Sequence, residues 1–219
     1  MSNRRIAGGA GVLFVAMNVI AVFAPGKPPK YDAPIDKILQ YVVEKDSQIV
    51  GAAFVAAMAS VFALVFFVGL WRVLRGGEGE GFDFATVFLA GGVAAAAVVT
   101  VGTAIMAVPA FESEQFGTPS QDIVRFATDA SGLTFVLLSG LLVTLLLAAA
   151  VSIFRGRTLP SWLGGLAVLA AALAVASGLG ITSGKLYNVG LALGFLPIMV
   201  WVLATSVVLL TGQDRAGAA

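Results

Sequence analysis

The sequence alternates between long uncharged runs and short charged segments. Six runs contain no Asp, Glu, Lys or Arg, and each exceeds the ~20 apolar residues with which a helix crosses a hydrocarbon core about 30 Å thick. The runs are apolar on every side, whereas membrane strands alternate apolar and polar positions. We therefore predict transmembrane helices at about residues 6–25, 48–71, 85–108, 132–154, 161–182 and 188–211.

Two of the charged connections carry a similar pattern. PIDKILQYVVE (34–44) follows the first span, and PSQDIVRFATD (119–129) follows the third span, 85 residues later. Each segment begins with a proline, which suits the first turn of a helix, and Thr118 is a candidate N-cap for the second. In the first segment the apolar residues recur at the spacing of one helical face: Ile35, Ile38, Leu39, Val42 and Val43.

These patterns together predict the fold class. It is all-α, a polytopic membrane protein whose six spans form three hairpins in a single domain over residues 1–219. Short amphipathic outer helices lie between spans one and two and between spans three and four. Such helices rest on the membrane surface or fold over the bundle, and a binding surface is the alternative role.

The first two hairpins share an order of features. Each has a double glycine, a proline that we expect to end the first span (Pro25 and Pro109), a charged outer segment and a closing Arg-Gly pair. This order favours an internal repeat, although a chain with 26 glycines also aligns with itself by chance. Repeats are common in transporters and occur in other membrane proteins as well.

Composition narrows the possible chemistry. Hydrophobic residues make up 59% of the chain and charged residues 11%, against about 25% charged in an average soluble domain. The chain has no cysteine and no histidine, which removes disulfides, the commonest haem, zinc and copper ligands and the usual general base. We expect no cofactor, no metal and no catalytic residue. The net charge of +1 gives no reason to expect a nucleic-acid partner.

The charged residues at the span ends predict orientation. An arrangement with both termini in the cytoplasm of a plasma-membrane protein places seven arginines inside and six basic residues outside, and the arginines lie closest to the span ends. The inside residues are Arg4, Arg5, Arg72, Arg75, Arg155, Arg157 and Arg215, and the outside residues are Lys27, Lys30, Lys37, Lys45, Arg125 and Lys185.

The sequence lacks the residues that several functional classes require. No ionisable side chain lies inside a span, which disfavours proton-coupled carriers and a retinal Schiff base. GGEGEGFD (76–83) resembles a phosphate loop but carries acids and no following lysine, so we expect a flexible linker. The outer acids could gather around calcium, although solvated faces explain them as well; they are Asp32, Asp36, Glu44, Asp46, Glu112, Glu114, Asp122 and Asp129.

A few residues within the spans form a candidate ligand site. Asn18 is an amide deep in the first span, and Asn188 enters the sixth span. Pro197 removes a backbone donor in that span, which predicts a kink, and Trp201 lies one turn beyond. A pocket for a ligand and a simple packing arrangement both remain open for these four residues.

Small residues at four-residue spacing predict close helix packing. Lipid gives no hydrophobic drive for helices to associate, so small residues allow the close approach that dispersion requires. Gly190 and Gly194 form such a pair, and Ala172, Ala176, Gly180 and Gly184 form a longer one. These contacts fit packing within the chain or a homo-oligomer seam, so the expected partners are membrane lipids and a second copy or a larger membrane complex.

Two short segments carry a family resemblance. Arg5-Ile6-Ala7-Gly8 and Leu159-Pro160-Ser161-Trp162-Leu163-Gly164, which open the first and fifth spans, resemble bacterial six-span membrane proteins of a domain family with no assigned function. The abundance of Ala, Gly and Val is similar to that of a high-GC bacterium such as an actinobacterium. The resemblance implies the same topology and assigns no catalytic residue.

The sequence leaves three functions to compare. The first is a non-enzymatic plasma-membrane protein that serves as an accessory or scaffold subunit or binds a lipid or another apolar ligand. The alternative is a facilitator or transporter of a small neutral or apolar solute. An enzyme that acts on lipid headgroups through outer carboxylates such as Glu112, Glu114 and Asp122 comes third.

Overall fold

The computed structural model describes residues 3–79, 81–182 and 186–212. These residues form seven helices: α1 (Asn3–Phe23), α2 (Ile35–Glu44), α3 (Asp46–Arg75), α4 (Phe84–Phe116), α5 (Gln121–Gly156), α6 (Ser161–Thr182) and α7 (Tyr187–Thr211). All except α2 are long and apolar enough to cross a membrane. The chain is thus a six-span helical membrane protein, and each predicted span corresponds to one of these helices.

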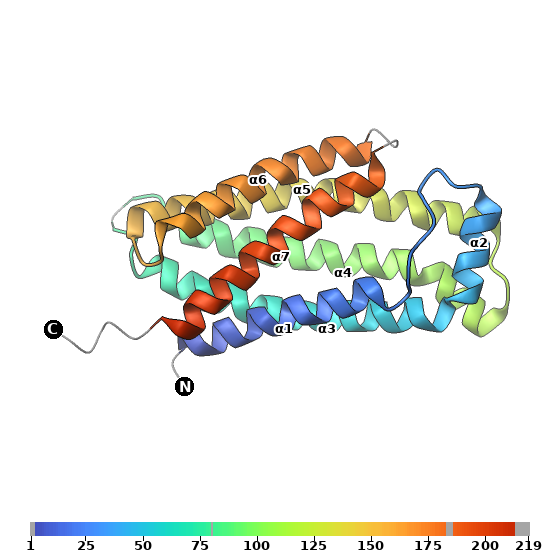
Figure 1. Cartoon of the computed structure of the whole chain (residues 1–219), viewed down its shortest axis with the longest axis horizontal. Coiled ribbons are helices and arrows are strands. Elements are labelled where there is room, and N and C mark those ends of the chain that lie inside the picture. Colours follow the sequence, from blue (N-terminus) through green and yellow to red (C-terminus); the bar gives the residue numbers. More distant parts are fainter. Residues whose placement is uncertain (1–2, 80, 183–185, 213–219) are drawn as a thin grey trace.

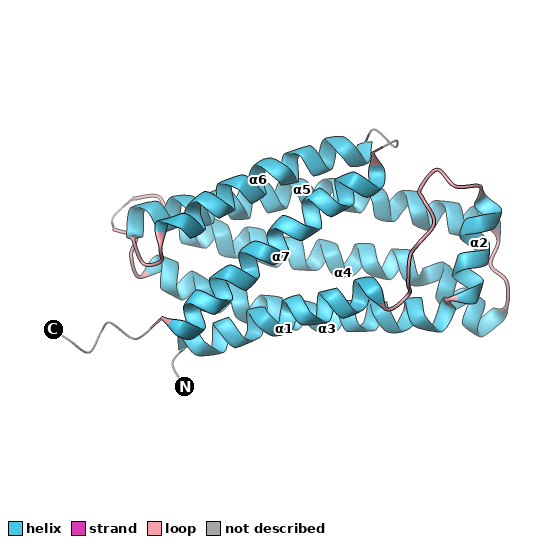
Figure 2. Ribbon diagram, viewed as in Figure 1, coloured by secondary structure: helices cyan, strands magenta, loops and turns pink. Residues whose placement is uncertain are grey.

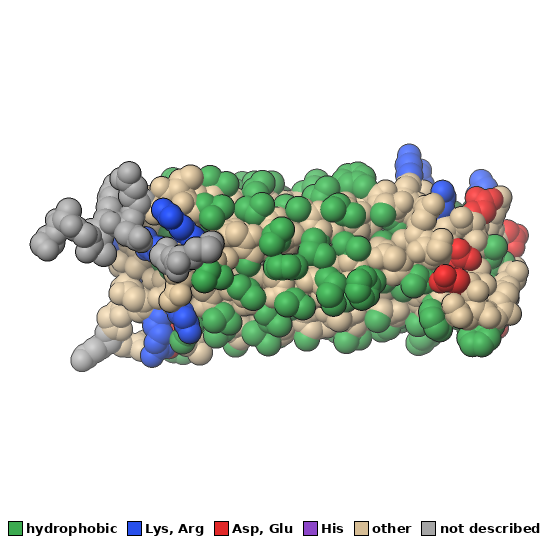
Figure 3. Space-filling view, turned by 90° about the horizontal axis from the view of Figure 1, so that it is seen from below, with side chains coloured by type: hydrophobic (Ala, Val, Ile, Leu, Met, Phe, Trp, Pro, Cys, Tyr) green, Lys and Arg blue, Asp and Glu red, His purple; other side chains and the backbone are tan. Residues whose placement is uncertain are grey.

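The six long helices form a closed ring (Figures 1 and 2). Each packs on the next along the chain, and α7 returns to pack on α1. One end of the ring, the arginine end, carries Arg4, Arg5, Arg72, Arg75, Arg155 and Arg157. The opposite end, the α2 end, carries the acidic side chains seen in Figure 3, and a belt of hydrophobic side chains lies between the two ends.

The spanning helices fall into two length classes. α1, α6 and α7 have 21, 22 and 25 residues, whereas α3, α4 and α5 have 30, 33 and 36. At a rise of 1.5 Å per residue, the second class is longer by about 10–20 Å. Figure 1 shows this extra length at the α2 end, where α3, α4 and α5 extend past the other three helices.

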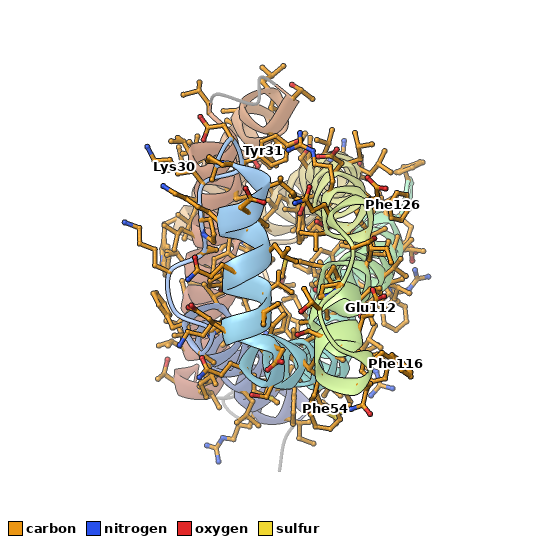
Figure 4. All side chains as sticks on the ribbon, turned by 90° about the vertical axis from the view of Figure 1, so that its right-hand side faces the viewer. Lys30, Tyr31, Phe54, Glu112, Phe116 and Phe126 are labelled. Atoms are coloured by element: carbon orange, nitrogen blue, oxygen red, sulfur yellow. The ribbon has the colours of Figure 1, made fainter. Side chains whose placement is uncertain are left out.

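Helix α2 lies across the extended ends of α3, α4 and α5 (Figure 4). Ile38 and Val42 are buried, and Val42 packs in a cluster with Ile49 of α3 and with Ala107 and Ala110 of α4. The hydrophobic spacing in this segment therefore predicts both the helix and its buried face. α2 is separate from α3 because the backbone leaves the helical conformation at Lys45.

The second outer segment is helical but does not form a separate helix. Residues 121–129 are the first turns of α5, which continues without interruption to Gly156. No proline or glycine lies between Gln121 and Ser131 to break the helix. The cap also differs from the expected Thr118, because Ser120 accepts a hydrogen bond from the amide of Ile123 at 3.3 Å.

Pro109 does not end the helix that contains it. α4 runs through this residue to Phe116, although proline lacks the amide that an interior helical position uses. The neighbouring Ala107 and Ala110 are buried against α2 and α3. Packing on both sides of the proline thus holds α4 helical beyond the predicted span end.

Four aromatic rings fill the interior between α3, α4 and α7. Phe66 and Phe67 of α3, Phe88 of α4 and Trp201 of α7 form a cycle in which each ring meets two others edge to face, with centroids 5.7–6.4 Å apart. This geometry is favourable for aromatic quadrupoles. All four side chains are buried, so they make a packed core rather than a passage.

Glycines face hydroxyl side chains at four of the six interfaces around the ring. A Cβ at any of these glycines would come closer to the opposing side chain than packed atoms allow. Each interface therefore depends on glycine, which has no side chain. The pairs are Gly102 with Thr134, Gly178 with Ser139, Gly194 with Ser177 and Gly11 with Ser206. The small residues thus act within the chain.

The interface that closes the ring gives a first prediction. A methyl group at Gly8 would lie 2.8 Å from the carbonyl oxygen of Ser206, whereas one at Gly9 meets no atom within 4 Å. Gly8→Ala should lower the free energy of unfolding by about 1–3 kcal/mol. Gly9→Ala should leave it unchanged or raise it by up to about 1 kcal/mol through helix propensity. Thermal unfolding in detergent, followed by circular dichroism, compares the two; equal melting temperatures would contradict this packing.

Candidate functional site

Trp201 does not line an open pocket. Its side chain has 0% exposure, and its indole N–H donates a hydrogen bond to the carbonyl of Leu163 in α6 at 3.1 Å. Its ring contacts Phe66 and Phe88. These contacts use the donor and place the ring edge to face with two phenylalanines in the core, as is usual for a buried tryptophan.

The other three predicted site residues take no part in this core contact where their side chains are described. Asn18 is buried, and its side-chain amide donates to the carbonyl of Phe14 in the same helix at 2.9 Å. Pro197 lies inside α7, which continues as one helix on both sides. Asn188 is in the first turn of α7, and its side chain lies outside the described part of the structure. A ligand site formed by the four remains a prediction.

A groove lies elsewhere among the described residues, between α1 and α3 at the arginine end. It has a volume of about 380 Å³ and opens on the side of the ring. Figure 3 looks onto this side, where hydrophobic side chains cover the surface between the charged ends. Apolar residues make most of its lining, namely Ile6, Ala7, Leu64, Val65, Val68 and Gly69.

Small residues create the floor of this α1–α3 groove. Gly69 lies against the methyl group of Ala7, so closely that a side chain at Gly69 would displace α1. Larger side chains stand on both sides of this contact, and Leu64, Val65 and Val68 are 39–40% exposed. In a membrane these exposed faces meet lipid, because they lie within the spanning part of α3.

Polar groups line only one end of the groove. Asn3 and Arg72 complete the lining, and both are exposed. No hydrogen bond or ion pair joins the Arg72 side chain to any residue in the described ranges. Its cationic group therefore stands at the mouth of an apolar groove, free to meet an anion.

The two described acids at the arginine end have other partners. Asp83 forms an ion pair with Arg75 and accepts a hydrogen bond from the amide of Thr86. Glu78 accepts hydrogen bonds from the Ser152 hydroxyl and from the amide of Ala85, the latter at 3.0 Å. These contacts leave no described carboxylate to neutralise Arg72.

The contacts of Glu78 correct one expectation from the sequence. Segment 76–83 was expected to be a flexible linker, but Glu78 ties it to α4 and α5. Ser152 has 0% exposure, and a carboxylate that accepts from a buried hydroxyl and a helix N-terminal amide is held by charge-assisted bonds. The part of this segment around Glu78 is thus held against α4 and α5, while Glu80 lies outside the described residues.

A second polar cluster joins the loop before α2 to α5. The Tyr31 hydroxyl donates to a carboxylate oxygen of Asp129 at 2.7 Å, and Arg125 both pairs with Asp129 at 3.2 Å and stacks on the Tyr31 ring. The hydrogen bond to Asp129, followed by desolvation, raises the pKa of Tyr31 above its ordinary value. Burial raises the pKa of Tyr41 in α2.

Two of the other outer acids make separate contacts. Asp36 accepts from the side-chain amide of Gln121 at 3.0 Å, and Asp46 accepts from the Ser113 hydroxyl at 3.2 Å. Among the described residues, no three Asp, Glu, His or Cys side chains gather as metal ligands would. The outer carboxylates thus join α2 and α3 to α4 and α5.

No protein-family model, curated protein or solved structure matches this chain. The likeness of residues 5–8 and 159–164 to bacterial six-span proteins therefore remains a resemblance. Inference about function depends on the groove, the packed interior and the charges at the two ends.

The buried contact of Glu78 gives a second prediction. Glu78→Gln replaces a charged acceptor with a weaker one and turns an amide donor toward Ser152 or Ala85. We expect the free energy of unfolding to fall by about 1–3 kcal/mol. Glu114→Gln, at an exposed position, is the matched control and should change it by less than about 0.5 kcal/mol. Denaturation in detergent measures both, and equal effects would rule out the tie.

The Tyr31 contact predicts a change at alkaline pH. Because the pKa of Tyr31 is raised above 10.0 in the folded state, its contact stabilises the protein fully below pH 10.0 and is lost as the pH rises through the raised value. Ultraviolet titration of phenolate formation should show a late step that disappears in Tyr31→Phe. The same step should move to lower pH in Asp129→Asn; an unchanged position would exclude Asp129 as its cause.

Proposed function

We propose that this protein is a non-enzymatic membrane protein that binds an apolar ligand, a membrane lipid above all, in the α1–α3 groove. The observation that carries the proposal is the groove itself, about 380 Å³ in volume and apolar along most of its lining. It opens sideways, at the level of the spanning helices. A lipid therefore reaches it by diffusion within the bilayer.

The packed interior supports this proposal over the transporter alternative. A facilitator for a small neutral solute needs a path between the helices from one end of the ring to the other. Trp201, Phe66, Phe67 and Phe88 occupy the interior toward the arginine end, and all four are buried. A facilitator would have to separate this aromatic core in each transport cycle.

The proposal includes a location and an orientation. We place the protein in the plasma membrane of a bacterium with the arginine end in the cytoplasm, because the basic residues at that end are arginines that lie directly at the ends of the spans. Trp71 and Trp162 lie at the arginine end, where indole rings act as interfacial anchors. An accessory or scaffold role is compatible with the same groove, since a bound lipid can bridge neighbouring proteins.

The groove predicts which substitution displaces the ligand. Val65→Phe places a larger side chain inside the groove, whereas Val61→Phe adds the same group to an exposed position of α3 that does not line it. After purification in mild detergent, wild type and Val61→Phe should retain about one phospholipid per chain. Val65→Phe should retain less than about half of that amount, measured by mass spectrometry of extracted lipid. Equal retention in all three proteins would contradict the proposal.

A further inference from the structure

The geometry points to a specific ligand class for the α1–α3 groove: an anionic phospholipid whose phosphate binds Arg72 and whose acyl chain lies along Val68, Val65 and Leu64. This inference rests on the proposed function and adds the headgroup, the leaflet and the residue that recognises it. In the orientation proposed above, the lipid belongs to the cytoplasmic leaflet, because Arg72 is at the arginine end.

The dimensions of the groove fit an acyl chain. From Leu64 to Arg72 the helix rises about 12 Å, which is most of the ~15 Å thickness of one hydrocarbon leaflet. The groove is about 380 Å³ in volume, is open along one side and is lined over this length by apolar residues of α3. An acyl chain that lies along α3 therefore contacts this lining over most of one leaflet.

The polarity of the lining follows the polarity of a phospholipid. Six apolar residues line the groove toward the bilayer centre, and the two polar residues, Asn3 and Arg72, are at the end nearest the arginine-rich surface. The Arg72 guanidinium presents a planar set of N–H donors that matches two phosphate oxygens. The groove thus has a group that can bind phosphate, the Arg72 guanidinium, at the membrane depth where a phospholipid carries its phosphate.

The charge around Arg72 selects a headgroup with net negative charge. Arg4 and Arg5 precede Ile6 of the groove, and the acids Glu78 and Asp83 are occupied by Ser152 and Arg75. A zwitterionic headgroup brings a cation into this positive field, whereas phosphatidylglycerol brings none. One basic residue near the membrane surface contributes about 1 kcal/mol toward an anionic lipid, which corresponds to a preference of about fivefold.

Competition between two lipids tests the inference. The full-length protein, delipidated in detergent, is mixed with equimolar phosphatidylglycerol and phosphatidylcholine that carry the same acyl chains, and native mass spectrometry identifies the lipid that stays bound. We expect wild type to favour phosphatidylglycerol about fivefold. Arg72→Gln should lose the preference, and Arg72→Lys should keep part of it.

A control variant and added phosphate separate the explanations. Arg157→Gln removes one charge from the same end outside the groove and should keep the preference. An equal loss of the lipid preference in Arg157→Gln and Arg72→Gln would overturn the inference, because a general charge effect would then explain the preference. Loss of the preference on adding inorganic phosphate to wild type would also overturn it, since the site would then hold free phosphate.

The same experiment distinguishes this inference from the function on which it rests. One outcome is that wild type binds both lipids equally while Val65→Phe displaces them. In that case the groove binds lipid without discriminating between headgroups, and the role proposed for Arg72 is wrong. If wild type retains no lipid, or if Val65→Phe retains as much as wild type, the proposed function itself is wrong.

Discussion

The architecture depends on Trp201 in the middle of the ring. Its indole N–H reaches the carbonyl of Leu163 on α6, and its ring contacts Phe66 on α3 and Phe88 on α4. One side chain of α7 thus connects three other helices, in an environment where an unpaired N–H would be costly. This contact fills the interior toward the arginine end, and the α1–α3 groove lies on the outer surface of the ring at the same end.

The groove and the tight interfaces have the same physical origin. Lipid does not push helices together, so the chain uses small residues to bring backbones close. Where glycine opposes a hydroxyl, as at Gly11 and Ser206, the interface is filled. Where Gly69 meets Ala7, the close approach of two backbones leaves the larger neighbours standing apart, and a groove results. The groove and the tight interfaces therefore follow from one packing rule.

The sequence predicts the spans and α2 well because both depend on local patterns. An uncharged run and a spacing such as Ile38 and Val42 are visible in one segment of chain. The continuity of α5 is harder to predict, since residues 121–129 have the same pattern whether or not the helix stops after them.

The site residues were the least predictable from the sequence. For Arg72, the sequence predicts only that it lies at the end of a span. That it lies beside Ile6 depends on which helix packs against α1. Trp201 and Glu78 bond partly to backbone groups, those of Leu163 and Ala85, which leave no signal in side-chain patterns.

The unequal lengths of the helices affect how the protein meets its surroundings. If α1, α6 and α7 match the hydrocarbon core of the bilayer, the ends of α4 and α5 extend about 10–20 Å beyond it. Phe116 and Phe126, which are 82% and 71% exposed, lie near these ends. The hairpin tip around Gly117 is therefore open to soluble macromolecules on that side of the membrane, whereas the hydrophobic belt of the ring faces lipid.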